Sequence, residues 1–241
     1  MAQKQILKTH RFMDCRNCKN LQCFINKYCL TGWLEYTEQR KTRKLLSASE
    51  TIFSEGEHVN GIFVICSGKA KILLKTSKEE QIIRLAGKGQ VLGHRGFSDE
   101  MIYPVSAKTL DDSEIAYIPN EDFFRLIRAN KDLAFYMMMF FADELLQSEQ
   151  KLRVNELTSP QEKLAATILI IINAFGYKDR KTKLVDLSIS LKDLANFARI
   201  SYSSLTRVLD VFEKDGMVRR DKSKLYINDS AALRKVAKRG L

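Results

Sequence analysis

Residues Ser190–Val218, SLKDLANFARISYSSLTRVLDVFEKDGMV, decide the fold of the C-terminal part of the chain. Ser190 with an acid three residues on, Asp193, has the form of a capping signal and predicts a short helix after it. Ile200 and Ser201 then turn the chain, and Ser201 can cap a second helix. The spacing of that second helix directs four apolar residues inward: Leu205, Val208, Leu209 and Phe212. Two helices joined by a tight turn, the second amphipathic, are typical of a helix-turn-helix.

The residues after this second helix predict a basic β-hairpin. Lys214–Gly216 end the helix, and Val218–Arg220 and Leu225–Ile227 give two short strands around a polar tip at residues 221–224. A hairpin in this place is the wing of a winged helix. The predicted C-terminal domain, residues 160–241, carries a net charge of +8, against +6 for residues 1–50 and −3 for residues 51–159. Such a basic end suits a polyanion such as DNA, although lysine and arginine can also simply keep a surface soluble.

The outer face of the second helix has the chemistry of a DNA reader. Its outward residues are Tyr202, Ser203, Ser204, Thr206 and Arg207. Small hydroxyl side chains let the helix approach the major groove, and Arg207 can offer two hydrogen bonds to guanine. Ser190, Lys192 and Ser201 lie at helix starts, which suit phosphate contacts. The alternative for Arg207 is a surface salt bridge with Asp210 or Glu213.

The middle of the chain reads as strands followed by helices. Short apolar runs punctuated by glycine between Thr51 and Ile118 predict a small antiparallel sandwich or barrel. Asn120 begins a helix, and a longer helical run extends from Asp132 to about Thr158. A helix of this length exceeds what a small domain needs, so we expect it to pack against a second copy in a homodimer; packing on its own domain alone is the alternative. Ser159 and Pro160 end the run, and residues 161–175 form a new helix before Gly176.

Length and composition agree with a soluble two-domain protein. The 241 residues include 40 Lys and Arg and 29 Asp and Glu, which gives a net charge of +11. The hydrophobic and charged fractions exclude a disordered or fibrous chain. No apolar run is long enough to span a membrane and no apolar leader is present, so we expect a cytoplasmic protein. His10, His58 and His94 stand in no catalytic arrangement, so we expect no enzyme.

Residues from about 50 to 227 resemble the Crp/Fnr family of bacterial transcription regulators. The resemblance rests on IFSEGE, IFVICSGKAKILL, AGKGQVLG, SAKTLDDSEIAYIPNEDF and the stretch quoted first. It implies an α+β fold with an N-terminal antiparallel β-roll of the cyclic-nucleotide-binding type, a long dimerisation helix and a C-terminal winged helix-turn-helix. The expected units are residues 1–50 (cysteine-containing segment), 51–131 (β-roll), 132–159 (dimerisation helix) and 160–241 (DNA-binding domain).

The resemblance also implies a function, the sequence-specific regulation of transcription from a pseudo-palindromic site in double-stranded DNA, with RNA polymerase as a partner if the protein is an activator. Base reading would fall to Tyr202, Ser203, Thr206 and Arg207, with Ser203 at the position of the family's usual glutamate. Arg199 replaces a frequent glycine in the turn, which implies a different turn or a left-handed arginine. A sensor that acts only through protein partners is the alternative.

The sequence indicates the signal that the protein senses less clearly than it indicates DNA binding. Cyclic-AMP-binding members carry a Gly-Glu step and an Arg-Ser pair, but this chain has Gly93-His94 and, in the later stretch, residues 101–105 without the phosphate-binding arginine. We therefore expect no cyclic AMP, and the sequence assigns no effector pocket. Arg95 is either a substitute anion ligand or an exposed surface residue.

Four of the five cysteines, Cys15, Cys18, Cys23 and Cys29, follow the spacing C-x2-C-x4-C-x5-C. Thiols this close suit a thiophilic metal or an iron–sulfur cluster. The resemblance implies a [4Fe–4S] cluster, with zinc and unliganded thiols as the alternatives, and a regulator that responds to redox conditions or to a ligand. The family's β-roll ligand position is Ala116, so Cys29 would supply the fourth ligand locally. Cys66 is expected to be a core or strand thiol. The basic residues Arg40, Lys41, Arg43 and Lys44 are expected to solvate a helix face; the alternative is an approach to DNA, as the resemblance implies for some family N-termini.

Overall fold

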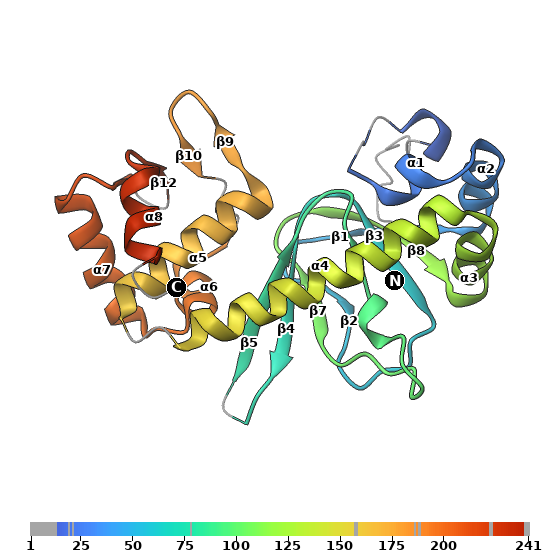
Figure 1. The fold of residues 1–241 in the computed structure, drawn as a ribbon, viewed down its shortest axis with the longest axis horizontal. Helices are drawn as coiled ribbons and strands as arrows, with labels where there is room; N and C mark the ends of the chain where they lie inside the picture. Colours follow the sequence, from blue (N-terminus) through green and yellow to red (C-terminus); the bar gives the residue numbers. More distant parts are fainter. Residues whose placement is uncertain are drawn as a thin grey trace, which may run out of the picture.

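The computed structural model describes residues 14–18, 20, 22–77, 79–156, 159–185, 187, 189–221 and 224–238. Its described part contains an N-terminal β-roll with covering helices, one long helix and a C-terminal domain (Figure 1). The expected α+β architecture is confirmed. Within the described residues, no helix is both long enough and apolar enough to cross a membrane.

The β-roll consists of two antiparallel four-stranded sheets, with the strand orders β1-β8-β3-β6 and β2-β7-β4-β5. The strands are β1 (Thr42–Leu46), β2 (Thr51–Phe53), β3 (Gly61–Ser67), β4 (Ala70–Lys75), β5 (Glu80–Ala86), β6 (Val91–Leu92), β7 (Ser106–Thr109) and β8 (Ser113–Pro119). Inward side chains of both sheets meet in one core that includes Phe53, Ile65, Ile72, Leu92 and Ile115. Glycines with positive φ at Gly56, Gly68 and Gly89 form the turns that the sequence marks.

Strand β1 was not expected from the sequence, because its residues TRKLL contain two basic side chains. It pairs with β8, with Arg43 opposite Ala116, so the sheet begins before Thr51. The expectation that these basic residues solvate a helix face is wrong for Lys41 and Arg43, whose side chains are only 4% and 8% exposed. Both are accepted inside because Glu38 neutralises them. Lys44 is exposed on β1, and Arg40 is exposed at the end of helix α2.

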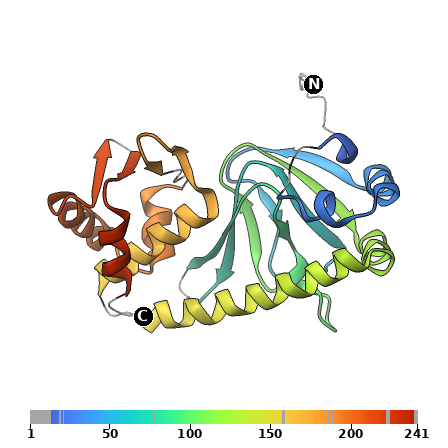
Figure 2. The same ribbon diagram turned by 45° about the horizontal axis from the view of Figure 1, so that its top comes forward.

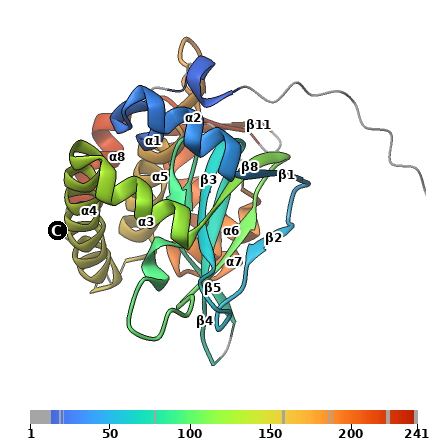
Figure 3. The ribbon, with the colours of Figure 1, turned by 90° about the vertical axis from the view of Figure 1, so that its right-hand side faces the viewer.

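The N-terminal segment is part of the β-roll's packing. The short 3-10 helix η1 (Cys15–Asn17) and helices α1 (Phe24–Tyr28) and α2 (Thr31–Arg40) lie beside β3 and β8 (Figure 3). Phe24 and Ile25 are almost fully buried, and they share a core with Ile62, Val64 and the helix α3 (Asn120–Ala129). The cysteines are therefore held against the outer face of a strand pair.

Helix α4 (Lys131–Glu156) has 26 residues, which corresponds to about 39 Å at 1.5 Å per residue. It runs along the whole β-roll toward the C-terminal domain (Figure 2). Leu133 and Met137 are buried against its own β-roll. Another face stays exposed and carries six large apolar side chains: Phe135, Met138, Met139, Phe141, Leu145 and Leu146. The expected end of this helix at Thr158 lies outside the described residues.

The C-terminal domain is a winged helix-turn-helix with one extra hairpin. Its elements are α5 (Pro160–Phe175), β9 (Tyr177–Asp179), β10 (Leu184–Val185), α6 (Leu191–Ala198), α7 (Tyr202–Lys214), β11 (Val218–Asp221), β12 (Lys224–Ile227) and α8 (Ser230–Lys238). The sheet order is β11-β12-β10-β9, and the β9–β10 hairpin was not expected. Pro160 begins α5 and does not merely precede it, because a helix's first residue needs no N–H donor. Wing-tip residues 222–223 lie outside the described part.

The C-terminal domain is docked on the hairpin formed by β4 and β5. Ile82 belongs to the same apolar core as Leu164 and Ile168 of α5. The Asn196 side chain of α6 accepts a hydrogen bond from the Ile82 N–H at 2.8 Å and donates to the Glu80 carbonyl at 3.0 Å. An ion pair of 2.7 Å between Lys71 of β4 and Asp193 joins the other strand of the hairpin to α6. The β-roll thus contacts the helix-turn-helix directly.

Candidate nucleic-acid interface and cysteine cavity

Helix α7 presents the outer face that its sequence predicts. Ser201 caps it by accepting a hydrogen bond from the Ser204 N–H at 3.1 Å. Its four expected inward residues are all buried. Ser203 and Arg207 are exposed and Tyr202 is 53% exposed, whereas Ser204 and Thr206 are half-buried. The Ser204 hydroxyl already accepts a bond from Ser201, and the Thr206 hydroxyl donates to the Ser203 carbonyl at 2.9 Å. Tyr202, Ser203 and Arg207 are therefore the most available contacts.

Arg207 does not form the salt bridge that the sequence left open. Asp210 and Glu213 instead bind Arg220 of β11, at 2.6 and 2.8 Å. Within the described residues Arg207 has no ion pair closer than 4 Å. The two acids that could have paired with Arg207 thus connect β11 of the wing to α7 instead. The Arg207 side chain is left exposed on α7.

The helix starts expected to meet phosphate are formed as predicted. The Ser190 hydroxyl accepts from the Asp193 N–H at 3.0 Å, and Lys192 and Ser201 are exposed. Arg199 adopts the left-handed conformation, with φ 54° and ψ 45°, so the second of the two expected turn geometries is present. Lys192, Ser201 and Tyr202 also line a cavity of about 610 Å³ whose far side is the β4–β5 hairpin at Thr76, Glu79 and Gln81.

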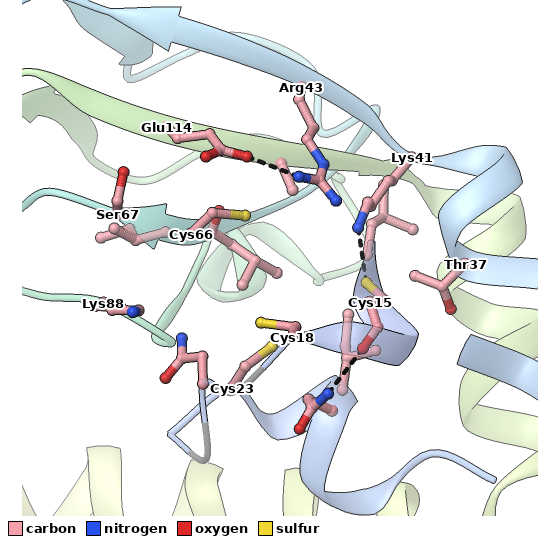
Figure 4. A pocket seen from close by; sticks show the side chains of 17 residues that line it. Cys15, Cys18, Cys23, Thr37, Lys41, Arg43, Cys66, Ser67, Lys88 and Glu114 are labelled. Atoms are coloured by element: carbon pink, nitrogen blue, oxygen red, sulfur yellow. Dashed lines mark hydrogen bonds and ion pairs between the residues drawn. The ribbon is translucent and has the colours of Figure 1, made fainter. Parts of the chain in front are cut away.

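A second cavity, of about 310 Å³, gathers cysteines from two distant parts of the sequence. Cys15, Cys18 and Cys23 enter it from the N-terminal segment, and Cys66 enters it from β3 (Figure 4). Ala116 of β8 is also on its wall, whereas Cys29 is not. Sequence reasoning had set Cys66 aside as a core or strand thiol. A bulge between Ile65 and Ser67 in the β3–β8 pairing falls at this cysteine, so strand alternation alone could not settle its direction.

Cations and anions line the same cavity. Lys41 Nζ donates to Cys15 Sγ at 2.7 Å, and the Cys15 N–H donates to Glu38 at 2.9 Å. Arg43 bridges Glu38 and Glu114 at 3.1 and 2.9 Å. A thiolate is stabilised by a nearby ammonium group, so the cavity can hold negative sulfur ligands.

Burial is the main cause of the raised pKa values of four thiols. It raises the pKa of Cys15 and Cys23, and it raises the pKa of Cys29 and of Cys66 to about 12. Neutral thiols are poor nucleophiles, and binding of a metal by these cysteines would release their protons. Among the described side chains, no group of three or more His, Cys, Asp and Glu lies close enough to hold a single metal ion.

Gly93 and His94, where the sequence departs from the Gly-Glu step expected of cyclic-AMP-binding members, lie beside a cluster of charged side chains. Glu144 of α4 binds Arg84 of β5 at 3.2 Å and Arg95 at 2.6 Å. His94 Nε2 lies 3.7 Å from the same carboxylate, which is too far for a hydrogen bond. The remaining cavity, lined by His94, Arg95 and residues 103–105 among others, measures about 10 Å³. Arg95 is thus neither free for a ligand nor a plain surface residue.

This cluster also fixes the charge states of its members. Burial by itself raises the pKa of Glu144, but the positive charges of Arg84 and Arg95 oppose burial, and the pKa is lowered to about 2. Burial lowers the pKa of His94, so the imidazole is neutral inside the protein. Its ring packs edge-on against Phe140 and Phe141 of α4.

Comparison with known proteins agrees with this arrangement. Residues 43–130 match the cyclic nucleotide-binding domain and residues 162–236 match the Crp-like helix-turn-helix domain. The transcriptional activator protein FnrA of Stutzerimonas stutzeri is 23% identical over 97% of this chain and 96% of its own. The anaerobic regulatory protein of Bacillus subtilis is 26% identical over 78% of this chain and 80% of its own. The structure of FixK2 from Bradyrhizobium japonicum shares the fold, with a TM-score of 0.72 and 15% identity over 81% of this chain and 96% of that one.

A sensor-type β-roll joined by one long helix to a winged helix-turn-helix defines a DNA-binding transcription regulator. The chain belongs to the Crp/Fnr family, as the resemblance predicted.

Proposed function

We propose that this regulator is a cytoplasmic homodimer that binds a pseudo-palindromic DNA site and responds to redox conditions through a cysteine-bound iron–sulfur cluster. The observation that carries the DNA-binding part is the exposed α7 face with Arg207 left unpaired by Asp210 and Glu213. Arg207, Tyr202, Ser203 and Thr206 would face base edges, while Ser190, Lys192, Ser201 and Ser204 would serve phosphates or the helix cap.

Dimerisation through α4 is supported by its exposed apolar face. Six large apolar side chains between residues 135 and 146 are at least 42% exposed. A continuous apolar stripe on a helix of this length is the expected surface for a second copy of the same helix. Two recognition helices would then enter successive major grooves, about 34 Å apart. If the protein is an activator, RNA polymerase is the further partner.

The chemistry of the cysteine cavity fits an iron–sulfur cluster. Thiolates are its ligands, and three cysteines of the N-terminal segment line one cavity together with Lys41 and Arg43. In a four-iron cluster each cysteine binds a different iron, so the sulfurs need not surround one point. When bound, such a group supplies sensitivity to oxidation. Cys15, Cys18 and Cys23 would hold it, Lys41 would balance the charge of Cys15, and Cys29 is the fourth ligand suggested by the sequence.

The sensor is proposed not to bind cyclic AMP. A cavity of about 10 Å³ at the corresponding place is barely enough for one water molecule. Arg84 and Arg95, which could otherwise bind a phosphate, are engaged by Glu144. A nucleotide would have to break that buried pair.

The DNA-binding proposal is tested by titrating the purified protein with DNA at several salt concentrations. The site is selected from a random pool, and a scrambled duplex is the control. Tight binding to the selected site with a steep salt dependence is expected, because Lys and Arg release counterions from phosphates. A flat salt dependence with no preference between duplexes would overturn the proposal and favour a sensor that acts through protein partners.

A further inference from the structure

We propose that Cys66 of β3, and not Cys29, is the fourth cysteine ligand at the N-terminal site. The inference rests on the proposed thiol-bound group and goes further by assigning a ligand from the β-roll. If correct, the site is shared between the N-terminal segment and the sensor sheet.

The first argument is position. Four cysteines line the 310 Å³ cavity, and Cys66 is the one that comes from the sheet. It packs with Cys15 and Cys23 on the outer face of the sheet, in the cluster that contains Val64. Its neighbour Ile65 points to the opposite face, into the core of the roll. In Figure 4 the Cys66 side chain points into the space that Cys15, Cys18 and Cys23 also enter.

The second argument concerns Cys29, which is separated from Cys23 by the whole of α1. Cys23 is the N-cap of that helix and Cys29 is its C-cap. Six residues along a helix correspond to roughly 9 Å of axial rise. Cys29 packs against the same apolar cluster as Cys15, Cys23 and Cys66, but it is not on the cavity wall.

The third argument is charge. Lys41 and Arg43 line the cavity between the N-terminal segment and the sheet, with side chains only 4% and 8% exposed. Glu38 and Glu114 pair with them in this structure. Sulfur ligands brought in from Cys15 and Cys66 would lie beside these two cations, so additional negative charge in the cavity is balanced where it arises. Nothing comparable lines the surroundings of Cys29 among the residues that the structure describes.

This arrangement gives the site a physical link to the DNA-binding half. Strand β3 is paired with β8, which leads directly into α3 and then α4. A ligand on β3 would therefore join the N-terminal segment to the sheet from which the long helix departs. A site made only of residues 15–29 would have no ligand on the sheet itself and would be connected to it only through α2 and β1.

The test uses the full-length protein, purified without oxygen and supplied with iron and sulfide. Iron, acid-labile sulfide and visible absorption are measured for wild type, Cys66→Ser and Cys29→Ser. We expect the wild type and Cys29→Ser to retain iron and acid-labile sulfide, and Cys66→Ser to lose most of both. Retention by Cys66→Ser with loss in Cys29→Ser would overturn the assignment, as would equal retention in both variants.

A rescue variant separates ligation from a folding role of Cys66. Ala116 lines the same cavity from β8 and is paired with Val64. The double variant Cys66→Ser, Ala116→Cys should regain iron and sulfide if the sheet must contribute one thiol. Failure of this rescue, together with altered circular dichroism of Cys66→Ser, would show a structural role only and overturn the proposal.

The wild-type result keeps the two proposals distinguishable. If the wild-type protein contains zinc and no acid-labile sulfide, the cluster hypothesis is wrong. The zinc content of the same two variants would still decide between Cys66 and Cys29. Wild type that takes up neither metal would overturn both proposals.

Discussion

Arg84 of β5 and Glu144 of α4 form an ion pair of 3.2 Å in which both side chains are only 8% exposed. The same carboxylate binds Arg95, so one residue of the long helix holds two arginines of the β-roll. The β-roll and the long helix are thus joined by a buried carboxylate of the chain itself.

Replacing Glu144 by glutamine should destabilise the protein by about 3 kcal/mol, because Arg84 would remain buried without its counter-charge. Urea unfolding followed by circular dichroism measures this. Glu121→Gln is the matched control, since Glu121 pairs with Arg125 on an exposed helix face. Its unfolding midpoint should stay at the wild-type value. Equal midpoints for both variants would contradict a stabilising role of the buried pair.

Stability should fall as the solution becomes acidic, in two steps. The lowered pKa of His94 means that only the unfolded chain takes up this proton just below pH 6.5, which favours unfolding. Glu144 has a folded pKa of about 2, so its stabilising charge is lost as pH falls from about 4.5 toward 2. The urea midpoint of wild type should therefore be lower at pH 5.5 than at pH 7.5. His94→Phe should show a smaller difference, and an unchanged difference would exclude His94 as the cause.

Arg207→Ala should remove sequence preference more than general DNA affinity. Loss of a two-hydrogen-bond contact to guanine costs about 1–3 kcal/mol at one base position. Lys192→Ala is the companion variant, because a lost phosphate contact should weaken binding to every duplex and reduce the salt slope by about one. Fluorescence anisotropy with selected and scrambled duplexes measures both. Equal losses on the two duplexes for Arg207→Ala would argue against base reading.

Leu145→Glu should dissociate the proposed dimer, because a charge would enter the apolar face of α4, where Leu145 is 63% exposed. Gln147→Glu introduces the same charge at another exposed position of the helix and should leave the dimer intact. Sedimentation equilibrium reads the oligomeric state of both. A dimer that persists in Leu145→Glu, or a monomeric wild type, would refute dimerisation through this face.

Local sequence signals located the DNA-binding half correctly. Ser190 and Ser201 cap their helices through contacts three residues away. Arg199 takes the left-handed conformation, one of the two that its place in the turn left open. The sequence did not predict β1, because a buried Arg43 breaks the alternation of apolar and polar residues that marks a strand. The partner that allows its burial, Glu114, lies 71 residues away in the sequence. The sequence likewise did not show which apolar residues of α4 are buried within the chain, because Leu133 and Met137 pack in the chain's own core.

The amino-acid sequence by itself determined the winged helix-turn-helix, the long helix and the family, because caps, turns and helical spacing act between near neighbours. Tertiary structure alone decided that Arg220 binds Asp210 and Glu213, that Glu144 binds Arg84 and Arg95, and that Cys66 lines a cavity with the N-terminal cysteines. These pairings depend on strand register, on a bulge and on the packing of one element against another. No local pattern encodes them, because the partners meet only after the chain has folded.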